Sequence, residues 1–538
     1  MVQAVKCEVH EENGIVVCLD QEKAYDKVRH DFIWATLNKL NFPQHFINTV
    51  KTLYENAETV IIINGVLSAP YKVKRGVQQG DPLSCLIFDL AIESLACMIR
   101  KSNIKGFKID GAKDRLVTTL FADDTTVYLS IKDSYNDLRN ILTKWCQASG
   151  AKFNDKKTVI IPVGTPDFRS EILVTRKLSD DSPPIPENVR IVADGTPVRV
   201  LGAYIGNKVE QAGVWAPTLE KLSQRLKHWE RSHPTQNGRH LIIGMEAGGL
   251  TQYLTRVQGM NKDIEAMIEK KIKNFMWDDK SPMVSQGILN SPIGQGGKKL
   301  LNIAARNEAI ELMRLKTYLG AGEARPKWAL VADSLIAQVI PSNLKVDPED
   351  RQSMYLQNWK PKLNGNDTLP TSLKKMIKVA NKHNVKLDVP HPCLEMKQEM
   401  PVWHHKGQSK HRGRPNHGRW QNCHRHTHKI KTVREMQDYL NKTRSPNHLE
   451  RKNCQCPPCR QDRDNGCENP RECRNAAKRA LDALQTKWDS RKPATNQPIA
   501  QLPSEKPSIS KNAGNWMKIP TGYRVFGQTK TTEDDPVL

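Results

Sequence analysis

Two short apolar runs that end in aspartate constrain the fold of this chain most strongly. The run Ile15–Leu19 is followed by Asp20. A second run ends in FADD, whose carboxylates belong to Asp123 and Asp124. The apolar and β-branched residues around these carboxylates predict strands. Aspartate is common in hairpin turns, and carboxylates also bind divalent cations, so the FADD segment alone leaves a turn and a metal site open.

The three aspartates predict a metal site when they are taken together. Adjacent like charges repel and raise each other's pKa unless a cation lies near them. Asp20 is the natural third ligand because it also ends an apolar strand. Carboxylates from neighbouring strand ends would hold two Mg²⁺ ions about 3.5–4 Å apart, one activating a hydroxyl and the other stabilising a leaving oxygen. Such a site is typical of phosphoryl transfer.

A glycine-rich segment, RGVQQGDPLS, lies between the acidic strands and precedes a long apolar helix. Gly76 and Gly80 allow a backbone to approach a ligand closely, and Gln79 offers amide hydrogen bonds. Pro82 near the helix start lacks only an N–H group that would have no partner there. A tight loop before a helix explains each residue singly. It does not explain their order between LDQEKAYD and FADD.

The hydrophobic pattern predicts two successive folded regions. Up to about Gly206, strand-like runs alternate with helix-period segments, which is typical of a layered α+β or α/β domain. In this region TVIIINGVLSAPYKV predicts a hairpin with its turn at Asn64-Gly65. From Trp215 to about Leu319 the pattern is almost purely helical, and its apolar stripes are core by default.

The charge of the chain favours a polyanionic partner. The 82 basic and 58 acidic residues give a net charge of +24, which suits nucleic acid, although a basic surface without this role is the alternative. The start of the chain has no apolar leader and no run approaches about 18 apolar residues, so we expect a soluble, intracellular protein with no membrane segment. The 12 cysteines then fit thiols or metal ligands better than disulfides.

The ordered motifs resemble the reverse transcriptases of non-LTR (LINE-type) retrotransposons. That family has a strand ending in Asp with an aromatic residue five positions on, then RGxxQGDPLS, a FADD or YADD hairpin, an NxxK element and a strand with LG. Here they read LDQEKAYD, RGVQQGDPLS, FADD, FNDKKTVII and VRVLGAYIG. The match covers about Ile15 to Gly206, and the helical region resembles the family's thumb and its extension. Single motifs are weak, but the whole ordered set is specific.

The resemblance implies an α+β right-hand polymerase palm that adds dNTPs to a DNA primer on an RNA template, with two Mg²⁺ ions. Asp20 and Asp123 match the principal metal ligands, and Asp124 matches the neighbouring carboxylate. Lys157 matches the NxxK lysine, which would neutralise or protonate the departing pyrophosphate. Its neighbour Lys156 is a rival for this role.

The resemblance also implies the residues that contact substrate. Tyr25 matches the aromatic residue that crowds the sugar 2′ position and so rejects ribonucleotides; a packed core tyrosine is the alternative. Gln79 and Gly80 match the loop that contacts template and incoming nucleotide. Gly76 belongs to the same loop, and Arg75 beside it would pair with a phosphate.

The chain departs from the family in three ways. Only 19 residues precede Asp20, where the family has a fingers region, and no endonuclease or ribonuclease H segment is recognisable. Cys85 stands where the family often has proline. We therefore expect an N-terminally truncated fragment with partial fingers. The alternative function is a non-catalytic nucleic-acid-binding remnant of such an element; a group II intron maturase is a rival that the Cys-rich segment does not suit.

A Cys-rich segment, CQCPPCRQDRDNGCENPREC, predicts a small tetrahedral Zn²⁺ site. Its cysteines are Cys454, Cys456, Cys459, Cys467 and Cys473. The spacing matches neither a zinc knuckle nor a pair of CxxC motifs, so an unliganded Cys-rich loop is the alternative. A weaker cluster, Cys423, His424, His426 and His428, would donate ligands or belong to a basic linker.

Composition predicts the order of the domains. They are a palm with incomplete fingers (1–210), an all-α thumb and extension (211–340), a basic His- and Pro-rich linker (341–453), a Cys-rich module with a short helix (454–490) and a tail (491–538). The C-terminal region is expected to be largely irregular, and its linker would bind phosphates or act as a tether. Nuclear residence follows from the family resemblance alone, and no pattern sets an oligomeric state.

Overall fold

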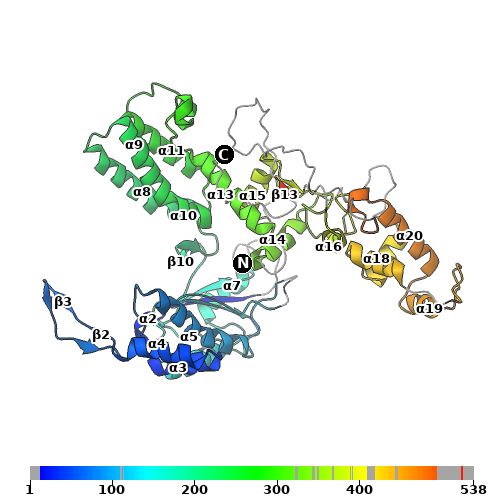
Figure 1. Ribbon diagram of the computed structural model, residues 1–538, viewed down its shortest axis with the longest axis horizontal. Helices are drawn as coiled ribbons and strands as arrows, with labels where there is room; N and C mark the ends of the chain where they lie inside the picture. Colours follow the sequence, from blue (N-terminus) through cyan, green and yellow to red (C-terminus); the bar gives the residue numbers. More distant parts are fainter. Residues whose placement is uncertain are drawn as a thin grey trace. The chain divides into compact units, whose positions relative to one another are not determined.

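The structure, a computed structural model shown in Figure 1, divides the chain into two compact units, residues 1–310 and 311–538. It describes residues 13–109, 112, 114–320, 325–341, 346–347, 350–365, 369–387, 389, 392–408, 418–442, 446–492 and 523–524. Most of the predicted tail and residues 409–417 of the predicted linker lie outside these ranges.

A five-stranded sheet forms the centre of the first unit, in the order β6-β7-β1-β8-β9. Its strands are β1 (Gly14–Leu19), β6 (Thr118–Phe121), β7 (Asp124–Ser130), β8 (Val159–Val163) and β9 (Arg190–Ile191). β1 lies between β7 and β8 and is antiparallel to both, whereas β8 and β9 are parallel. The two apolar runs that end in aspartate are β1 and β6, which belong to one sheet and are separated by β7, the strand that begins at Asp124.

Both faces of the sheet are buried, which is why β1 is apolar throughout. Ile15 and Val17 belong to a large core with the helices, whereas Val16 belongs to a smaller core with Phe107 and Ile161. Alternation along the strand sends successive side chains to opposite faces. The helices of this domain are α2 (Ala24–Lys27), α3 (His30–Lys39), α4 (Gln44–Glu55), α5 (Pro82–Arg100), α6 (Tyr135–Ser149) and α7 (Pro166–Thr175). Figure 1 shows α3, α4 and α5 gathered on one side of the strands.

The hairpin predicted at Asn64-Gly65 is confirmed. It consists of β2 (Glu58–Thr59), β3 (Ile62–Ile63), β4 (Val66–Leu67) and β5 (Tyr71–Lys72), in which β3 pairs with β4 and β2 with β5. Asn64 and Gly65 have φ values of 50° and 84°, as a two-residue turn of this kind requires. The apolar side chains of this hairpin are exposed.

Helix α5 is the one helix among the described residues that is long and apolar enough to cross a membrane. The sequence predicts a long apolar helix here and no membrane segment, because Asp89 and Glu93 interrupt the apolar run. Its side chains Phe88, Leu95 and Ile99 are buried in the core beside the sheet. Packing in a protein core therefore accounts for its composition.

The predicted helical region begins after a small hairpin of β10 (Val198–Val200) and β11 (Ala203–Ile205). Its helices are α8 (Gln211–Glu230), α9 (Gln236–Ile243), the π-helix η1 (Gly244–Gly248), α10 (Gly249–Gln258), α11 (Lys262–Trp277), α12 (Gln286–Asn290), the 3-10 helix η2 (Ile293–Gln295) and α13 (Ile303–Tyr318). Their apolar stripes bury one shared core that includes Trp215, Leu222, Ile268 and Phe275.

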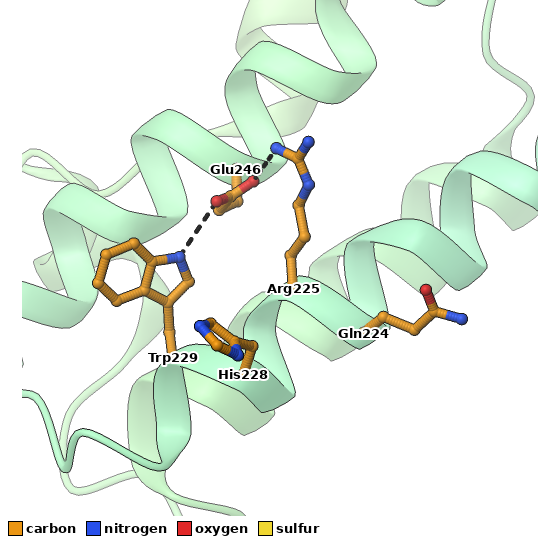
Figure 2. Close-up of a pocket in the computed structure, with 5 residues that line it drawn as sticks. All are labelled: Gln224, Arg225, His228, Trp229 and Glu246. Atoms are coloured by element: carbon orange, nitrogen blue, oxygen red, sulfur yellow. Dashed lines mark hydrogen bonds and ion pairs between the residues drawn. The ribbon is translucent and has the colours of Figure 1, made fainter. Parts of the chain in front are cut away.

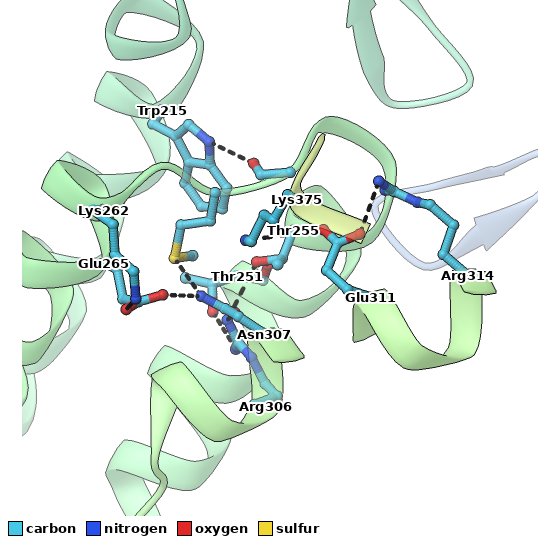
Figure 3. Close-up of polar contacts among 12 residues, drawn as sticks. Trp215, Thr251, Thr255, Lys262, Glu265, Arg306, Asn307, Glu311, Arg314 and Lys375 are labelled. Atoms are coloured by element: carbon cyan, nitrogen blue, oxygen red, sulfur yellow. Dashed lines mark hydrogen bonds and ion pairs between the residues drawn. The ribbon is translucent and has the colours of Figure 1, made fainter. Parts of the chain in front are cut away.

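Buried polar contacts join the start of α13 to α10 and α11 (Figure 3). The Asn307 amide donates hydrogen bonds to Glu265 Oε2 at 2.9 Å and to Met260 Sδ at 3.2 Å. The Arg306 guanidinium donates to the hydroxyl oxygens of Thr251 and Thr255 at 2.6 and 3.2 Å. The division between the two compact units falls inside α13, after Ile310.

In the second unit, part of the region predicted as an irregular linker forms helices. Its elements are α14 (Lys327–Gln338), α15 (Thr371–Lys382), β12 (Lys386–Leu387), α16 (Leu394–Glu399), α17 (Arg419–Asn422), the π-helix η6 (Cys423–Thr427), α18 (Val433–Asn441), α19 (Pro457–Asp464), α20 (Pro470–Asp482), the 3-10 helix η7 (Thr486–Trp488) and β13 (Tyr523–Arg524). The short helix predicted within residues 454–490 overlaps α20, which already contains Cys473 and ends at Asp482. β12 pairs with β13.

Part of the predicted linker packs against the predicted Cys-rich module. Trp403 and Val433 share a buried core with Cys473, Ala477 and Leu481. The linker interpretation differs from the structure because it considered residues 341–453 alone. Apolar side chains of this range, among them Trp403 and Val433, bury themselves against Ala477 and Leu481 of α20, which lies outside it.

Candidate functional site

The three predicted aspartates lie at one end of neighbouring strands. Phe121 pairs with Asp124, so Ala122 and Asp123 form the turn between β6 and β7. Ala122 adopts a left-handed φ of 50° there. Leu19, the last residue of β1, pairs with Thr125. The same antiparallel register therefore continues to Asp20 and Asp124, and it brings together carboxylates that are about a hundred residues apart in the sequence.

The carboxylates repel one another. Partial burial, followed by the negative charges of Asp123 and Asp20, raises the pKa of Asp124 above its ordinary value. This is the effect expected of like charges that share a site. A group of carboxylates under mutual repulsion is suited to a bound cation.

The NxxK segment turns back against Asp20. The Asn154 N–H donates to the Asp20 carbonyl at 2.8 Å, and the Lys157 N–H donates to the Asn154 carbonyl at 3.1 Å. This turn brings Lys157 Nζ to 3.9 Å from Asp20 Oδ2. Both side chains are well exposed, so solvent screens the pair and its contribution to stability is small. The contact puts Lys157, the lysine of the NxxK motif, beside Asp20.

Tyr25 and the glycine-rich loop are held together. The Tyr25 ring stacks on Phe88 with centroids 4.5 Å apart and an interplanar angle of 16°. Partial burial and a hydrogen bond with Cys85 raise the pKa of Tyr25, and the charges of Asp89 and Asp123 add to the shift. The Tyr25 carbonyl accepts a hydrogen bond from the Val77 N–H at 2.7 Å. Tyr25 and the glycine-rich loop, which were predicted from separate motifs, are therefore adjacent.

The remaining loop residues extend from this contact. Arg75 forms a backbone bridge with Arg29, and its side chain is exposed. Gln79 and Gly80 are exposed as well. The loop ends at Asp81, whose carboxylate accepts from the Leu83 N–H at 3.2 Å and from the Ser84 hydroxyl at 2.8 Å. Asp81 thus caps α5, and Pro82 occupies the first helical position, as predicted.

Sequence reasoning missed a pocket in the helical region (Figure 2), lined by Gln224, Arg225, His228, Trp229 and Glu246. Glu246 belongs to η1 and is buried. Its carboxylate accepts hydrogen bonds from the Arg225 guanidinium at 2.7 Å and from the Trp229 indole at 3.1 Å. Burial alone would raise the pKa of Glu246, but these two donors outweigh it and lower the pKa. The network joins α8 to η1.

The Cys-rich segment does not gather its five cysteines into one group. Cys467 and Cys473 lie in one set, together with Cys423 and His428. Cys454, Cys456 and Cys459 lie in the other set, together with His448. His448 was missed, although its place six residues before Cys454 was a usable signal. Of the weaker cluster, His424 and His426 belong to neither set. His424 instead stacks against Trp403.

The first part of the chain is similar to known proteins. Residues 2–205 match the family described as reverse transcriptase (RNA-dependent DNA polymerase). The chain is 27% identical over 332 residues to the transposon TX1 uncharacterized 149 kDa protein of Xenopus laevis, covering 60% of this chain and 24% of that protein. It is 26% identical over 236 residues to a retrovirus-related Pol polyprotein from the type-1 retrotransposable element R2 of Popillia japonica, covering 42% and 36%.

The chain therefore spans about a quarter to a third of the length of these relatives. Among solved structures, the telomerase of Candida tropicalis with a fragment of telomeric RNA is similar at 11% identity and a TM-score of 0.30, over 61% of this chain and 50% of that chain.

Proposed function

We propose that this chain, which carries a reverse transcriptase domain of the non-LTR retrotransposon type, extends the 3′-hydroxyl of a DNA primer with dNTPs on an RNA template. One observation carries the proposal. Asp20, Asp123 and Asp124 converge at one end of β1 and β7, beside the segment that holds Tyr25 and the glycine-rich loop. In this proposal the sheet domain is the palm and helices α8 to α13 belong to the thumb.

The carboxylates would hold the two Mg²⁺ ions. An all-oxygen donor set suits this hard cation. Partial burial, and then the charges of Asp123 and Asp20, raise the pKa of Asp124, and a cation would relieve the repulsion between these carboxylates. When bound, such ions activate the primer hydroxyl and stabilise the leaving oxygen. Asp20 and Asp123 would be the principal ligands, with Asp124 completing the group. Lys157, held beside Asp20, would provide positive charge or a proton for the departing pyrophosphate.

The loop and the tyrosine would select and position the nucleotide. The stacking of Tyr25 on Phe88 holds its ring in place, so the ring can exclude a 2′-hydroxyl by steric conflict. Gln79 and Gly80 are exposed on the loop and would contact the template and the incoming nucleotide. Arg75 would pair with a phosphate. The net charge of +24 suits an RNA and DNA partner.

Primer extension on poly(rA) with dTTP and Mg²⁺ tests the proposal. We expect extension by the chain and its loss, by a factor of at least about 100, in the Asp123→Ala, Asp124→Ala double variant, because removing the ligands removes transition-state stabilisation. Asp137→Asn, an exposed carboxylate in the first turn of α6, is the matched control and should keep full activity. RNA binding as a function of salt is measured in parallel for all three proteins.

Two outcomes would contradict the proposal. Extension that survives in the double variant would show that another site makes the product. Failure of every protein to extend, while all still bind RNA, would favour a nucleic-acid-binding role without catalysis.

A further inference from the structure

We propose that the second unit binds two zinc ions at separate sites, each made of three cysteines and one histidine. The outer site consists of Cys423, His428, Cys467 and Cys473, and the inner site consists of His448, Cys454, Cys456 and Cys459. Within each set, the ligand atoms all lie within 4.8 Å of one another. The inner site falls between His428 and Cys467 along the chain, so the outer site closes a loop around it. This inference concerns metal binding outside the proposed polymerase site.

The inner site has the dimensions of a tetrahedral zinc site. His448 Nδ1 lies 3.3 Å from Cys454 Sγ, 3.4 Å from Cys456 Sγ and 3.6 Å from Cys459 Sγ. Zn–N bonds of about 2.0–2.1 Å and Zn–S bonds of about 2.3 Å, at a tetrahedral angle, separate nitrogen and sulfur by about 3.6 Å. All three sulfur atoms thus lie near the separation that a shared zinc ion would impose.

Hydrogen bonding does not explain this convergence. A single imidazole nitrogen carries either one hydrogen or one lone pair, so it serves one strong hydrogen bond rather than three. A metal ion at the centre would use the same four atoms without conflict. The Leu449 N–H also donates to Cys454 Sγ at 3.3 Å, and such a bond stabilises a thiolate.

The inner site has little apolar core around it. Cys454, Cys456 and Cys459 are 0%, 5% and 2% exposed, yet they form a buried cluster with no other apolar member among the described residues. Three thiols do not make a core that can order such a loop. A structural metal replaces the missing core in small modules of this kind.

The outer site is marked by the environment of His428. Its side chain is 6% exposed, and its Nδ1 lies 4.0 Å from Asp462 Oδ1. The opposite nitrogen, Nε2, is buried and has no hydrogen-bond partner within the described part of the chain. A buried polar atom without a partner is costly. At 4.0 Å the Asp462 carboxylate lies near the ring but beyond hydrogen-bond distance, and Nε2 is the nitrogen that would bind the metal ion.

The cysteines of the outer site come from two separate segments. Cys423 begins η6, whereas Cys467 precedes α20 and Cys473 lies near its start. Cys467 and Cys473 belong to the same buried core as Trp403 and Val433. A zinc ion there would therefore join the two segments inside the main core of this part of the unit.

Metal analysis of the full chain, purified under reducing conditions with Zn²⁺ and then dialysed, tests the proposal. We expect two zinc ions per chain. His448→Ala and Cys473→Ser should each remove one ion, and the exposed Cys393→Ser is the matched control that should keep two. One ion or none in the unsubstituted chain would overturn the proposal.

A second measurement does not depend on folding of the variants. The zinc-loaded chain is treated with iodoacetamide before and after chelation, and modified cysteines are mapped by mass spectrometry. We expect protection of the six ligand cysteines that is lost on chelation, whereas exposed Cys85 and Cys393 react in both states. Reactivity of the six that does not change with the chelator would contradict the proposal.

Discussion

Asp124 illustrates what single residues contribute to the candidate active site. As a residue in a hairpin it has no special meaning, and its pKa is raised by partial burial first and then by the charges of Asp123 and Asp20, which the fold brings close. Tyr25 shows the same dependence. It is half-buried and stacked on Phe88, so the packed tyrosine and the nucleotide-selecting tyrosine that we considered are compatible.

Substitution of Tyr25 tests its role in selecting the sugar. Tyr25→Ala should relax discrimination between dTTP and UTP by a factor of 10 or more, which corresponds to about 1.4 kcal/mol, because the ring that excludes the 2′-hydroxyl is gone. Tyr25→Phe keeps the ring and should keep the discrimination. The ratio of kcat/KM for the two nucleotides is the measurement. Equal discrimination in both variants would limit Tyr25 to packing.

At the scale of elements, the glycine-rich loop is held by backbone contacts more than by its side chains. The Gly76 N–H donates to the Val28 carbonyl and the Gly76 carbonyl accepts from the His30 ring, at 2.7 and 2.9 Å. Gly76 has a φ of 82°, and a Cβ atom there would lie 2.7 Å from the Tyr25 carbonyl oxygen. The loop therefore needs glycine at this position for both conformation and space.

Gly76 and Gly80 provide a matched pair for testing this requirement. Both have positive φ, but a Cβ atom at Gly80 would meet nothing within 4 Å. Gly76→Ala should destabilise the first unit by about 2–4 kcal/mol, through strain and steric overlap, and Gly80→Ala by about 1 kcal/mol through strain alone. Urea unfolding measures both values. Equal losses would show that the close contact with Tyr25 is relieved at no cost.

For the molecule as a whole, the two units differ in what stabilises them. The first unit has a large apolar core on both sides of a sheet. The second has a smaller core that includes cysteines, and two sets of Cys and His ligands lie within it or beside it. The folding of the first unit should therefore not require zinc, whereas the folding of α18 to α20 should require it.

Hydrogen exchange of the full chain, with and without a chelator, tests this difference. Chelation should increase amide exchange in α18, α19 and α20, because the ligands no longer hold these helices together. Exchange in β1 and β7 should stay unchanged, since their protection comes from the sheet and its apolar core. The prediction would be contradicted if chelation increased exchange throughout both units, or if it caused no increase in α18 to α20.

The order of the motifs predicted the family and the residues of the candidate active site, because each motif is local and its chemistry depends on residue type. Strand periodicity also placed Asp20 and FADD at the ends of strands. Other features depended on contacts between distant segments. His448 and Cys423 belong to two Cys/His groups whose members no single sequence spacing predicts. Trp403 packs in a core with residues of α20, which lies far from it in the sequence. Local patterns record which face of an element is apolar, whereas the partner of that face is settled when the chain folds and brings distant residues together.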